Sequence, residues 1–381
     1  MSIYTALLIV LLNMSSFRAS KVLVSLFALE LGASQLTIGA LIAAYSLGPA
    51  LLAVHAGRLS DRLGVRLPML AGALGLAAGL LLPYLSSSLP ALFASAALIG
   101  VSHMFHNVSV QNLVGSLGGP EEHTRNFSNY ALAMAFGSFL GPIAAGLSID
   151  RYGHALSYLY IAGFPLVSAL ILVGARRLGG GRAGKSREER AADTKGLLAN
   201  PLLRRTLIAG AIAVTGQDLF QFYMPIYGYS VGLSASAIGV ILGMSGIAAF
   251  VVRMMLPALV RRWNTDTVFN GSLYVSAVAF LLFPLFANAP ALAAVALVLG
   301  FGMGCAQPVT LMLIYSRAPQ GRSGEALGMR VTINQFMHIT VPLIYGSLGS
   351  ALGVAPVFVI NSLIMAGGGM LNRARSGLTI K

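Results

Sequence analysis

The chain has 381 residues, of which 56% are hydrophobic and only 9% are charged. Water-soluble domains carry about 25% charged residues, so this composition excludes an ordinary soluble protein. Apolar stretches of about 20 residues, the length that an α-helix needs to cross a bilayer, recur along the whole sequence. We therefore predict an all-α membrane protein, because continuous apolar runs differ from the alternating pattern of a transmembrane β-barrel.

The formal net charge of +14 is concentrated in short segments between the apolar stretches. Every second connection is basic, and among the intervening connections Arg151 is the one basic residue. Cytoplasmic loops of membrane proteins carry an excess of Lys and Arg. We therefore expect a multi-pass protein of the cell (inner) membrane with both termini in the cytoplasm. Because orientation accounts for the charge, no nucleic-acid partner is expected.

Twelve transmembrane helices are expected, grouped in two pseudo-symmetric six-helix bundles. The N-terminal bundle covers residues 1–178 and the C-terminal bundle covers residues 202–381. Between them, the glycine-rich and then charged segment 179–201 is predicted to be a cytoplasmic linker. In chain order, the spans are expected at 4–29, 36–56, 68–86, 90–116, 127–149, 155–175, 204–229, 236–260, 268–287, 291–315, 326–349 and 354–371.

The two halves resemble each other when the sequence is shifted by 200 residues without a gap. Residues 31–41 (LGASQLTIGAL) lie over residues 231–241 (VGLSASAIGVI). A half-length repeat in an apolar chain predicts two bundles with a pathway between them. Glycines and prolines that shape helices coincide in the same register: Pro142 with Pro342, Gly146 with Gly346, and Gly153 with Gly353.

Residues 57–66 read GRLSDRLGVR and connect the second and third spans. Here the chain resembles the major facilitator superfamily, which carries G-x-L-x-D-R-x-G-x-R/K in this loop. We expect a gating role, because an aspartate near helix ends that bonds to a neighbouring helix in one conformation biases the opening of the cytoplasmic side. The alternative is a loop that only sets topology. Arg261 replaces the aspartate in the second half. The matching residues are Gly57, Leu59, Asp61, Arg62, Gly64 and Arg66.

Residues 137–146 (GSFLGPIAAG) in the fifth span resemble the motif of the superfamily's exporters, G-x-x-x-G-P-x-x-G-G. Small residues allow close helix packing and the proline bends the helix. The resemblance implies export of a drug or metabolite more than import, whereas an ordinary small-residue packing face is the alternative. Ala145 replaces one of the final glycines. The matching residues are Gly137, Gly141, Pro142 and Gly146.

Asp218, in the seventh span, is the only acid that we place well inside the bilayer. Ionisable groups at that depth are costly unless paired or hydrated, which makes them functional candidates. The repeat and the resemblance place the first and seventh spans as equivalent helices of a central cavity, so Arg18 is positioned to face Asp218. In one interpretation Asp218 takes up and releases a proton as its partner leaves and returns. In the other, Arg18 and Asp218 form a fixed ion pair.

The fourth span carries His103 and His106 and lacks the arginine that many proton-coupled exporters of the superfamily have there. Histidines titrate near neutral pH, so both join Asp218 as candidates for proton coupling, with hydrogen-bonded packing as the alternative. No metal site is predicted, because carboxylate and thiolate partners are missing. We treat Arg253 as structural. The candidate substrate-binding residues are Arg18, Lys21, Asn107, Gln217, Gln221, Asn334 and His338.

These features predict a secondary active transporter that moves a small organic solute by alternating access. The pathway is net cationic, which favours an anionic or neutral solute, and the exporter motif with Asp218 favours export by proton antiport. No phosphate-binding loop is found, so ATP drive is not expected. Neither an enzyme activity nor a cofactor is expected, because an enzyme needs a constellation of acids, metal ligands or nucleophiles and the spans offer one carboxylate. The expected partners are the lipid bilayer, the solute and protons, with the protein a monomer. The alternatives are a proton-coupled importer of an organic acid and, in another class, a membrane sensor or membrane enzyme.

Overall fold

The computed structural model describes residues 3–117, 120–174, 199–319 and 322–373. Within these ranges it describes only the backbone of residues 53–63, 120–121, 123–124, 323–324 and 373. The described chain is helical and contains no strand. Gly57, Asp61 and Arg62, which we expect to act in gating, are among the residues of which only the backbone is described.

Five α-helices precede the predicted linker and six follow it in the part of the chain that the structure describes. The first group is α1 (Ile3–Glu30), α2 (Gln35–Leu63), α3 (Arg66–Leu85), α4 (Leu89–Ser116) and α5 (Pro120–Gly174). The second group is α7 (Pro201–Ser230), α8 (Ala235–Trp263), α9 (Thr265–Leu282), α10 (Ala289–Arg317), α11 (Ser323–Leu352) and α12 (Val354–Arg373), with the short helix η1 (Phe283–Leu285) after α9.

Helix α5 contains the two spans that we expect at 127–149 and 155–175. Its backbone leaves the helical conformation at Gly153, where φ is 76°. This left-handed conformation costs little at glycine, so a single residue joins the two spans and no loop separates them. Gly353, its equivalent in the repeat, ends α11 in the same conformation, with a φ of 85°.

Nine stretches of the described chain are long and apolar enough to cross a membrane, and the one in α5 spans 50 residues. Helices α7 and α11 are not among them, although spans are expected there. Both helices carry polar side chains that line the cavity described below, including Asp218 and His338. Their lower hydropathy therefore follows from a face that is turned to the pathway and not to lipid.

Local helix signals repeat with the same 200-residue spacing as the sequence. Ser34 precedes α2 and Ser234 precedes α8, and each side chain accepts a hydrogen bond, 3.2 Å long, from the backbone N–H three residues later. Ser88 and Asn288 cap α4 and α10 in the same way. Such caps satisfy backbone donors that the first helical turn leaves free, so equivalent helices begin at equivalent residues.

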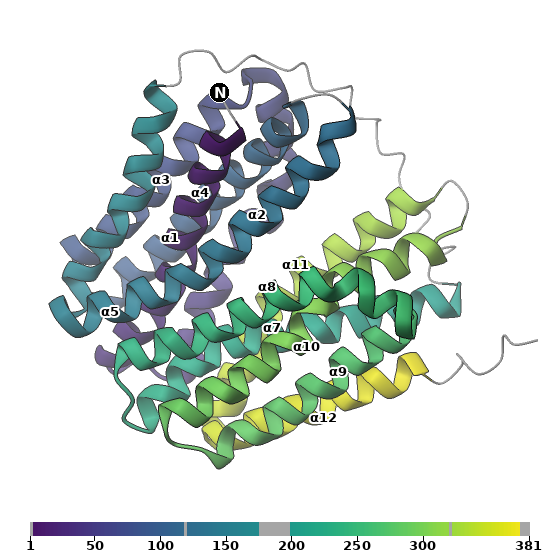
Figure 1. The fold of residues 1–381 in the computed structure, drawn as a ribbon. Helices are drawn as coiled ribbons and strands as arrows, with labels where there is room; N and C mark the ends of the chain where they lie inside the picture. Colours follow the sequence, from purple (N-terminus) through teal and green to yellow (C-terminus); the bar gives the residue numbers. More distant parts are fainter. Residues whose placement is uncertain (1–2, 118–119, 175–198, 320–321, 374–381) are drawn as a thin grey trace, which may run out of the picture.

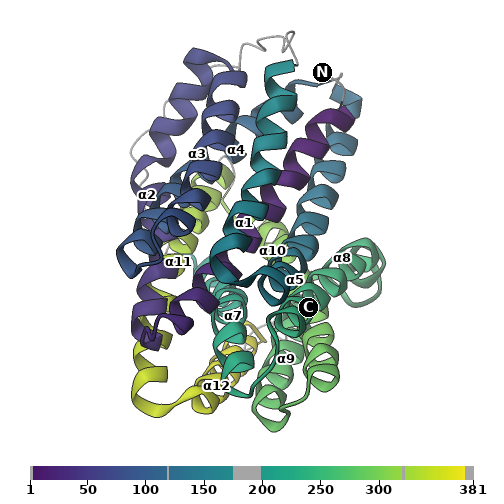
Figure 2. The ribbon, with the colours of Figure 1, turned by 90° about the vertical axis from the view of Figure 1, so that its left-hand side faces the viewer.

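The helices before and after the predicted linker lie in two groups (Figure 1). Helices α1–α5 occupy the upper left of the view and α7–α12 the lower right. The view turned by 90° places α3 in the upper part and α9 and α12 in the lower part (Figure 2). Between the groups, α5 packs against α8, α2 packs against α11, and α1 packs against α7, so each group contributes three helices to these contacts.

The two groups approach most closely near the α1–α2 and α7–α8 connections. A Cβ atom on Gly39 would overlap the carbonyl oxygen of Pro342, and one on Gly239 would overlap that of Pro142. These two contacts are equivalent in the repeat, because each pair of positions differs by 200 residues. We call the paired contacts of α5 with α8 and of α2 with α11 at these residues the seam.

Polar contacts close the same seam. The carboxylate of Asp150, in α5, accepts hydrogen bonds from the backbone N–H groups of Ala235 (3.0 Å) and Ser236 (2.9 Å), at the start of α8. At the equivalent place in the repeat, the hydroxyl of Ser350 accepts a hydrogen bond of 3.2 Å from the N–H of Leu36, in α2. Both helix N-termini are therefore capped by a side chain from the opposite half.

Candidate functional site

A cavity of about 530 Å³ lies between the two groups of helices. Its volume falls in the range of small-molecule sites, which is roughly 300–1,000 Å³. Residues of α1, α2, α4 and α5 line it from one half, and residues of α7, α8, α10 and α11 line it from the other. The closed seam lies at one end, because Pro142 belongs to both the seam and the cavity wall.

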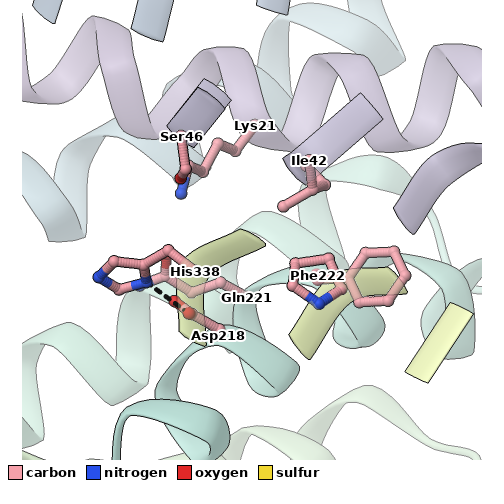
Figure 3. A pocket seen from close by; sticks show the side chains of 8 residues that line it. Lys21, Ile42, Ser46, Asp218, Gln221, Phe222 and His338 are labelled. Atoms are coloured by element: carbon pink, nitrogen blue, oxygen red, sulfur yellow. Dashed lines mark hydrogen bonds and ion pairs between the residues drawn. The ribbon is translucent and has the colours of Figure 1, made fainter. Parts of the chain in front are cut away.

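Asp218 is the one carboxylate among the described residues that line this cavity. Its side chain is 11% exposed and its Oδ2 lies 2.5 Å from Nδ1 of His338, in α11 (Figure 3). His338, which the sequence analysis places among the substrate-binding residues, is thus the direct partner of the predicted coupling carboxylate. Because the two residues share a hydrogen bond, a proton gained or lost by one changes the charge of the pair.

Arg18 lies in the cavity wall but does not form the expected ion pair with Asp218. No oxygen of a described carboxylate lies within 4.0 Å of its guanidinium nitrogens; instead, Nη1 donates a hydrogen bond to Oε1 of Gln221. Its Nε is buried without a hydrogen-bond partner. The pairing of Arg18 with Asp218 is therefore absent from this conformation. Arg18 bonds to Gln221 instead, and Asp218 bonds to His338.

Lys21 lies one turn further along α1 and packs on aromatic rings. Its Nζ is 5.2 Å from the ring centre of Phe17 and 5.8 Å from that of Tyr45, distances typical of cation–π contacts. Across from Lys21, a small cavity of about 10 Å³ separates it and Ser46 from Asp218 (Figure 3). This gap has roughly the volume that one water molecule occupies.

His103 and His106 have different surroundings, although they lie only three positions apart on α4. The ring of His103 lines the cavity and stacks on Phe17 with 3.8 Å between ring centres. His106 is 2% exposed, and its Nδ1 donates a hydrogen bond of 3.1 Å to the carbonyl of Met69, in α3. In the described chain, no group of three or more His, Cys, Asp or Glu residues is placed to hold a metal ion.

The remaining polar candidates are mostly, but not all, placed at the cavity. Asn107 lines it and accepts a hydrogen bond of 2.6 Å from the Tyr130 hydroxyl, and Gln217 lines it from α7. Asn334 is not among the described lining residues, whereas its neighbour Gln335 is. The rotation of α11 about its axis decides between these two neighbours, and the sequence pattern does not specify that rotation.

Arg253 of α8 also lines the cavity, although the sequence analysis treats it as structural. Its Nε donates a hydrogen bond of 3.3 Å to the carbonyl of Gly304, and no described carboxylate forms a salt bridge with it. An arginine within an apolar span is costly unless it is paired or faces a hydrated cavity. The position of Arg253 within an apolar stretch is therefore the sequence feature that could have identified it as a cavity residue.

The described part of the predicted gating loop joins two helices within the first half. Gly64 ends α2 with a φ of 75°. Arg66 begins α3 and donates hydrogen bonds to the carbonyls of Leu172 (3.1 Å) and Val173 (2.8 Å), in the last turn of α5. An arginine at the C-terminal end of a helix satisfies free carbonyls and complements the helix dipole.

The exporter-type motif packs against both halves at once. A Cβ atom on Gly141 would overlap the carbonyl oxygen of Ser15, in α1, so α5 lies close to α1 within a turn of Arg18. A Cβ atom on Gly146 would overlap the carbonyl oxygen of Ala235, in α8. These small residues thus let α5 pack closely between α1 of its own half and α8 of the other half.

Residues 6–342 match the family model described as Major Facilitator Superfamily. The chain belongs to the major facilitator superfamily. It is therefore a transporter with several membrane spans and not an enzyme, and the expected all-α membrane fold is confirmed. Because the match covers most of the chain, the family assignment applies to both halves.

Curated relatives include exporters. The chain is 26% identical over 318 residues to multidrug resistance protein MdtG of Citrobacter koseri, covering 80% of this chain and 76% of that protein. It is 23% identical over 346 residues to multidrug efflux pump LfrA of Mycolicibacterium smegmatis, covering 76% of this chain and 68% of that protein. The predicted likeness to the drug and metabolite exporters of the superfamily is confirmed at this level.

Solved structures show the same fold. The nucleoside transporter NupG superposes with a TM-score of 0.82 at 14% identity, covering 97% of this chain and 98% of that chain. A POT family transporter in complex with 5-aminolevulinic acid superposes with a TM-score of 0.80 at 13% identity, covering 97% and 94%. At these identities the likeness concerns the fold alone.

Proposed function

We propose that this transporter exports a small organic solute, anionic or neutral overall, across the cell inner membrane in exchange for protons. The observation that carries the proposal is the single carboxylate of the described cavity wall, Asp218, which lies opposite Arg18 and Lys21 of the other half. Multidrug resistance and efflux in the names of relatives support the outward direction.

The cations of the cavity favour a solute with an anionic group. Arg18, Lys21 and Arg253 line the cavity, and none of them forms a salt bridge with a described carboxylate. A partly buried cation without an opposite charge beside it is costly, so an anion that pairs with it gains the energy of a charge-assisted hydrogen bond. A lipophilic cation would instead be repelled by all three.

The proton carrier in this scheme is the pair of Asp218 and His338. The solute binds from the cytoplasm while the carboxylate is ionised, the halves rock, and a proton from outside then displaces the solute. Such exchange requires that proton and solute compete for the same group, since a group that bound both together would carry them in the same direction. We assign no coupling role to His106, which is hydrogen-bonded to α3 away from the cavity.

The structure corresponds to an inward-open state in this proposal. The basic connections place the α1–α2 and α7–α8 connections outside, so the seam closes the outer end of the cavity. Residues 1–178 and 202–381 then move as two bundles about the fixed site. In the outward-open state, the loop with Asp61 and Arg62 is proposed to latch the cytoplasmic end.

Transport in proteoliposomes tests the coupling. A thermal-shift screen of organic anions, zwitterions and lipophilic cations first identifies a ligand, because a ligand that prefers the folded state raises the melting temperature. With that ligand, the Asp218→Asn variant should retain solute–solute exchange but lose accumulation driven by a pH gradient. Glu122→Gln serves as the control, because Glu122 is 47% exposed and pairs only locally with Arg125.

Two results would contradict the proposal. Asp218 is not the coupling site if the Asp218→Asn variant still moves solute against its gradient in step with protons. The proposed solute class is wrong if lipophilic cations are transported and no organic anion or zwitterion is. Direction is read separately, by comparing accumulation in inside-out and right-side-out vesicles, where export predicts proton-driven uptake only in the inside-out preparation.

A further inference from the structure

We infer that the exported solute is amphoteric, with an acidic group that binds Arg18 and Lys21 and an ammonium group that binds Asp218. This inference rests on the proposed function, because it uses proton antiport as a premise. It goes further, since it excludes a simple organic anion and specifies two charged groups of opposite sign on one molecule.

The cavity has two poles that face each other across the interface between the halves. The cationic pole, Arg18 and Lys21, belongs to α1, and the anionic pole, Asp218, belongs to α7. Lys21 and Asp218 line the same gap of about 10 Å³ (Figure 3). Because the poles are that close, a solute whose acid and amine are separated by few bonds can contact both of them.

Each pole retains bonding capacity that the described protein does not use. The Nε of Arg18 is buried without a partner, and the Lys21 ammonium contacts the described residues through aromatic ring faces. His338 occupies Oδ2 of Asp218, while no hydrogen bond from a described residue reaches Oδ1. Buried donors are normally paired, and Arg18 Nε is an exception. Together with the Lys21 ammonium and Oδ1 of Asp218, it suits a ligand with both an acid and a donor.

The sign of the coupling selects the amphoteric solute over the plain anion. Protonation of Asp218 removes a negative charge beside Arg18 and Lys21, and this strengthens the binding of any anion. A plain anion and a proton would therefore bind together, which is the linkage of a symporter. A solute ammonium reverses this linkage, because it loses its ion pair when Asp218 is protonated. Proton and solute then exclude each other, as antiport requires.

Matched trios of ligands test the inference on the purified full-length protein in nanodiscs. Each trio keeps one apolar body and removes one charged group at a time. The three trios are tryptophan with indolepropionate and tryptamine, phenylalanine with phenylpropionate and phenethylamine, and leucine with isocaproate and isoamylamine. Calorimetry should show that at least one amphoteric member binds about tenfold or more tightly than its acid-only partner, the scale of one hydrogen bond to a charged group.

Variants and pH separate the two poles. Asp218→Asn should reduce the affinity for the amphoteric member to that of the acid-only member, whereas Lys21→Met should weaken both. Lowering the pH should weaken the amphoteric member and strengthen the acid-only member. The charged and titratable groups around Asp218 are His338 on α11, Lys21 and Arg18 on α1, and, elsewhere in the wall, Tyr45, His103 and Arg253. Histidine protonation alone would increase the affinity for both the amphoteric and the acid-only member. Opposite pH trends of the two affinities therefore identify Asp218.

The inference is overturned if no amphoteric member binds, or if the acid-only member binds as tightly as the amphoteric one in every trio. These outcomes differ from a failure of the proposed function. If acid-only solutes are exchanged against protons, the proposed antiport is retained and the amphoteric solute class is rejected. If amphoteric solutes bind independently of pH and of proton flux, the two-pole site is retained and the proposed antiport is rejected.

Discussion

At the scale of residues, the charges of the cavity differ in what compensates them. Asp218 is held by His338, whereas Lys21 is stabilised mainly by the faces of Phe17 and Tyr45. Cation–π contacts supply only about 0.5–2 kcal/mol, which is less than a buried ammonium loses on leaving water. We therefore expect Lys21 to be the residue of the pathway that is stabilised most when an anionic group binds.

The Lys21→Met variant tests this role. Methionine keeps the length and packing of the side chain on the two rings but removes the charge. We expect the affinity for phenylpropionate, measured by calorimetry, to fall by about 10- to 100-fold, as for the loss of one hydrogen bond to a charged group. An unchanged dissociation constant, with a normal melting temperature, would show that the ammonium does not bind the acid.

Away from the cavity, Arg317 organises one end of the second half. Its side chain, 9% exposed, pairs with Asp266 and donates hydrogen bonds to Thr206 and Asn372. These partners come from α7, α9 and α12, so one residue of α10 joins three other helices. The contacts identify Arg317 as a structural residue, although it belongs to the basic segments that orient the chain.

Arg317→Ala should therefore destabilise the protein. Removal of the guanidinium leaves Asp266 without its cation, and we expect a loss of about 1–3 kcal/mol, discounted because Asp266 is 32% exposed. The matched control is Arg125→Ala, whose side chain is 69% exposed and which should cost less than about 1 kcal/mol. Equal melting temperatures of the two variants in detergent would disprove the structural role.

At the scale of elements, close helix approach makes the seam. Gly239 of α8 and Gly39 of α2 bring backbone against backbone at the prolines of the opposite half. Helices in a membrane associate without a hydrophobic driving force between them, so packing at small residues contributes much of their attraction. A methyl group at either position would push the two halves apart at the end that is closed in this structure.

Gly239→Ala should shift the protein toward the state with an open seam. The state can be read from the distance between spin labels at Ser116→Cys and Ser316→Cys, equivalent exposed positions at the far ends of α4 and α10, in a Cys305→Ala background. We expect this distance to shorten as the far end closes. Gly271→Ala is the control, because no atom lies within 4 Å of its added Cβ. The same distance distribution in both variants would contradict the packing argument.

At the scale of the whole molecule, the repeat gives two equivalent interfaces whose polar contacts are not equal. Asp150 presents a carboxylate to two N–H groups of α8, whereas Ser350 presents a hydroxyl to one N–H group of α2. An acid at a helix N-terminus contributes about 0.3–1 kcal/mol through the helix dipole, in addition to the hydrogen bonds. The α5–α8 interface is therefore the stronger of the two polar links.

Asp150→Asn and Ser350→Asp should move the conformational equilibrium in opposite directions. The first variant removes a charge at the N-terminus of α8 and should increase the population with an open seam by about 2- to 5-fold. The second adds a charge at the N-terminus of α2 and should decrease that population. The same pair of spin labels measures both changes. Shifts in the same direction would show that these caps do not set the equilibrium.

The sequence by itself determined the class of the protein, the approximate spans, the superfamily and the residues that carry charge into the membrane. These properties depend on hydropathy, charge and short motifs, which act locally along the chain. The expected bundle boundaries and the role of Asp61 stay predictions, and both residue 178 and the side chain of Asp61 lie outside what the structure describes.

Only the tertiary structure decided which partner each charged residue has. His338 holds Asp218 from 120 positions away, and Gln221 holds Arg18 from 203 positions away. Such pairs depend on the rotation of each helix about its axis, which a periodic apolar sequence specifies poorly when both faces of a helix are buried in protein or lipid. The rotation of α4 likewise turns His103 to the cavity and His106 to α3. The rotation of α5 places Asp150 where it caps α8, a helix of the other half.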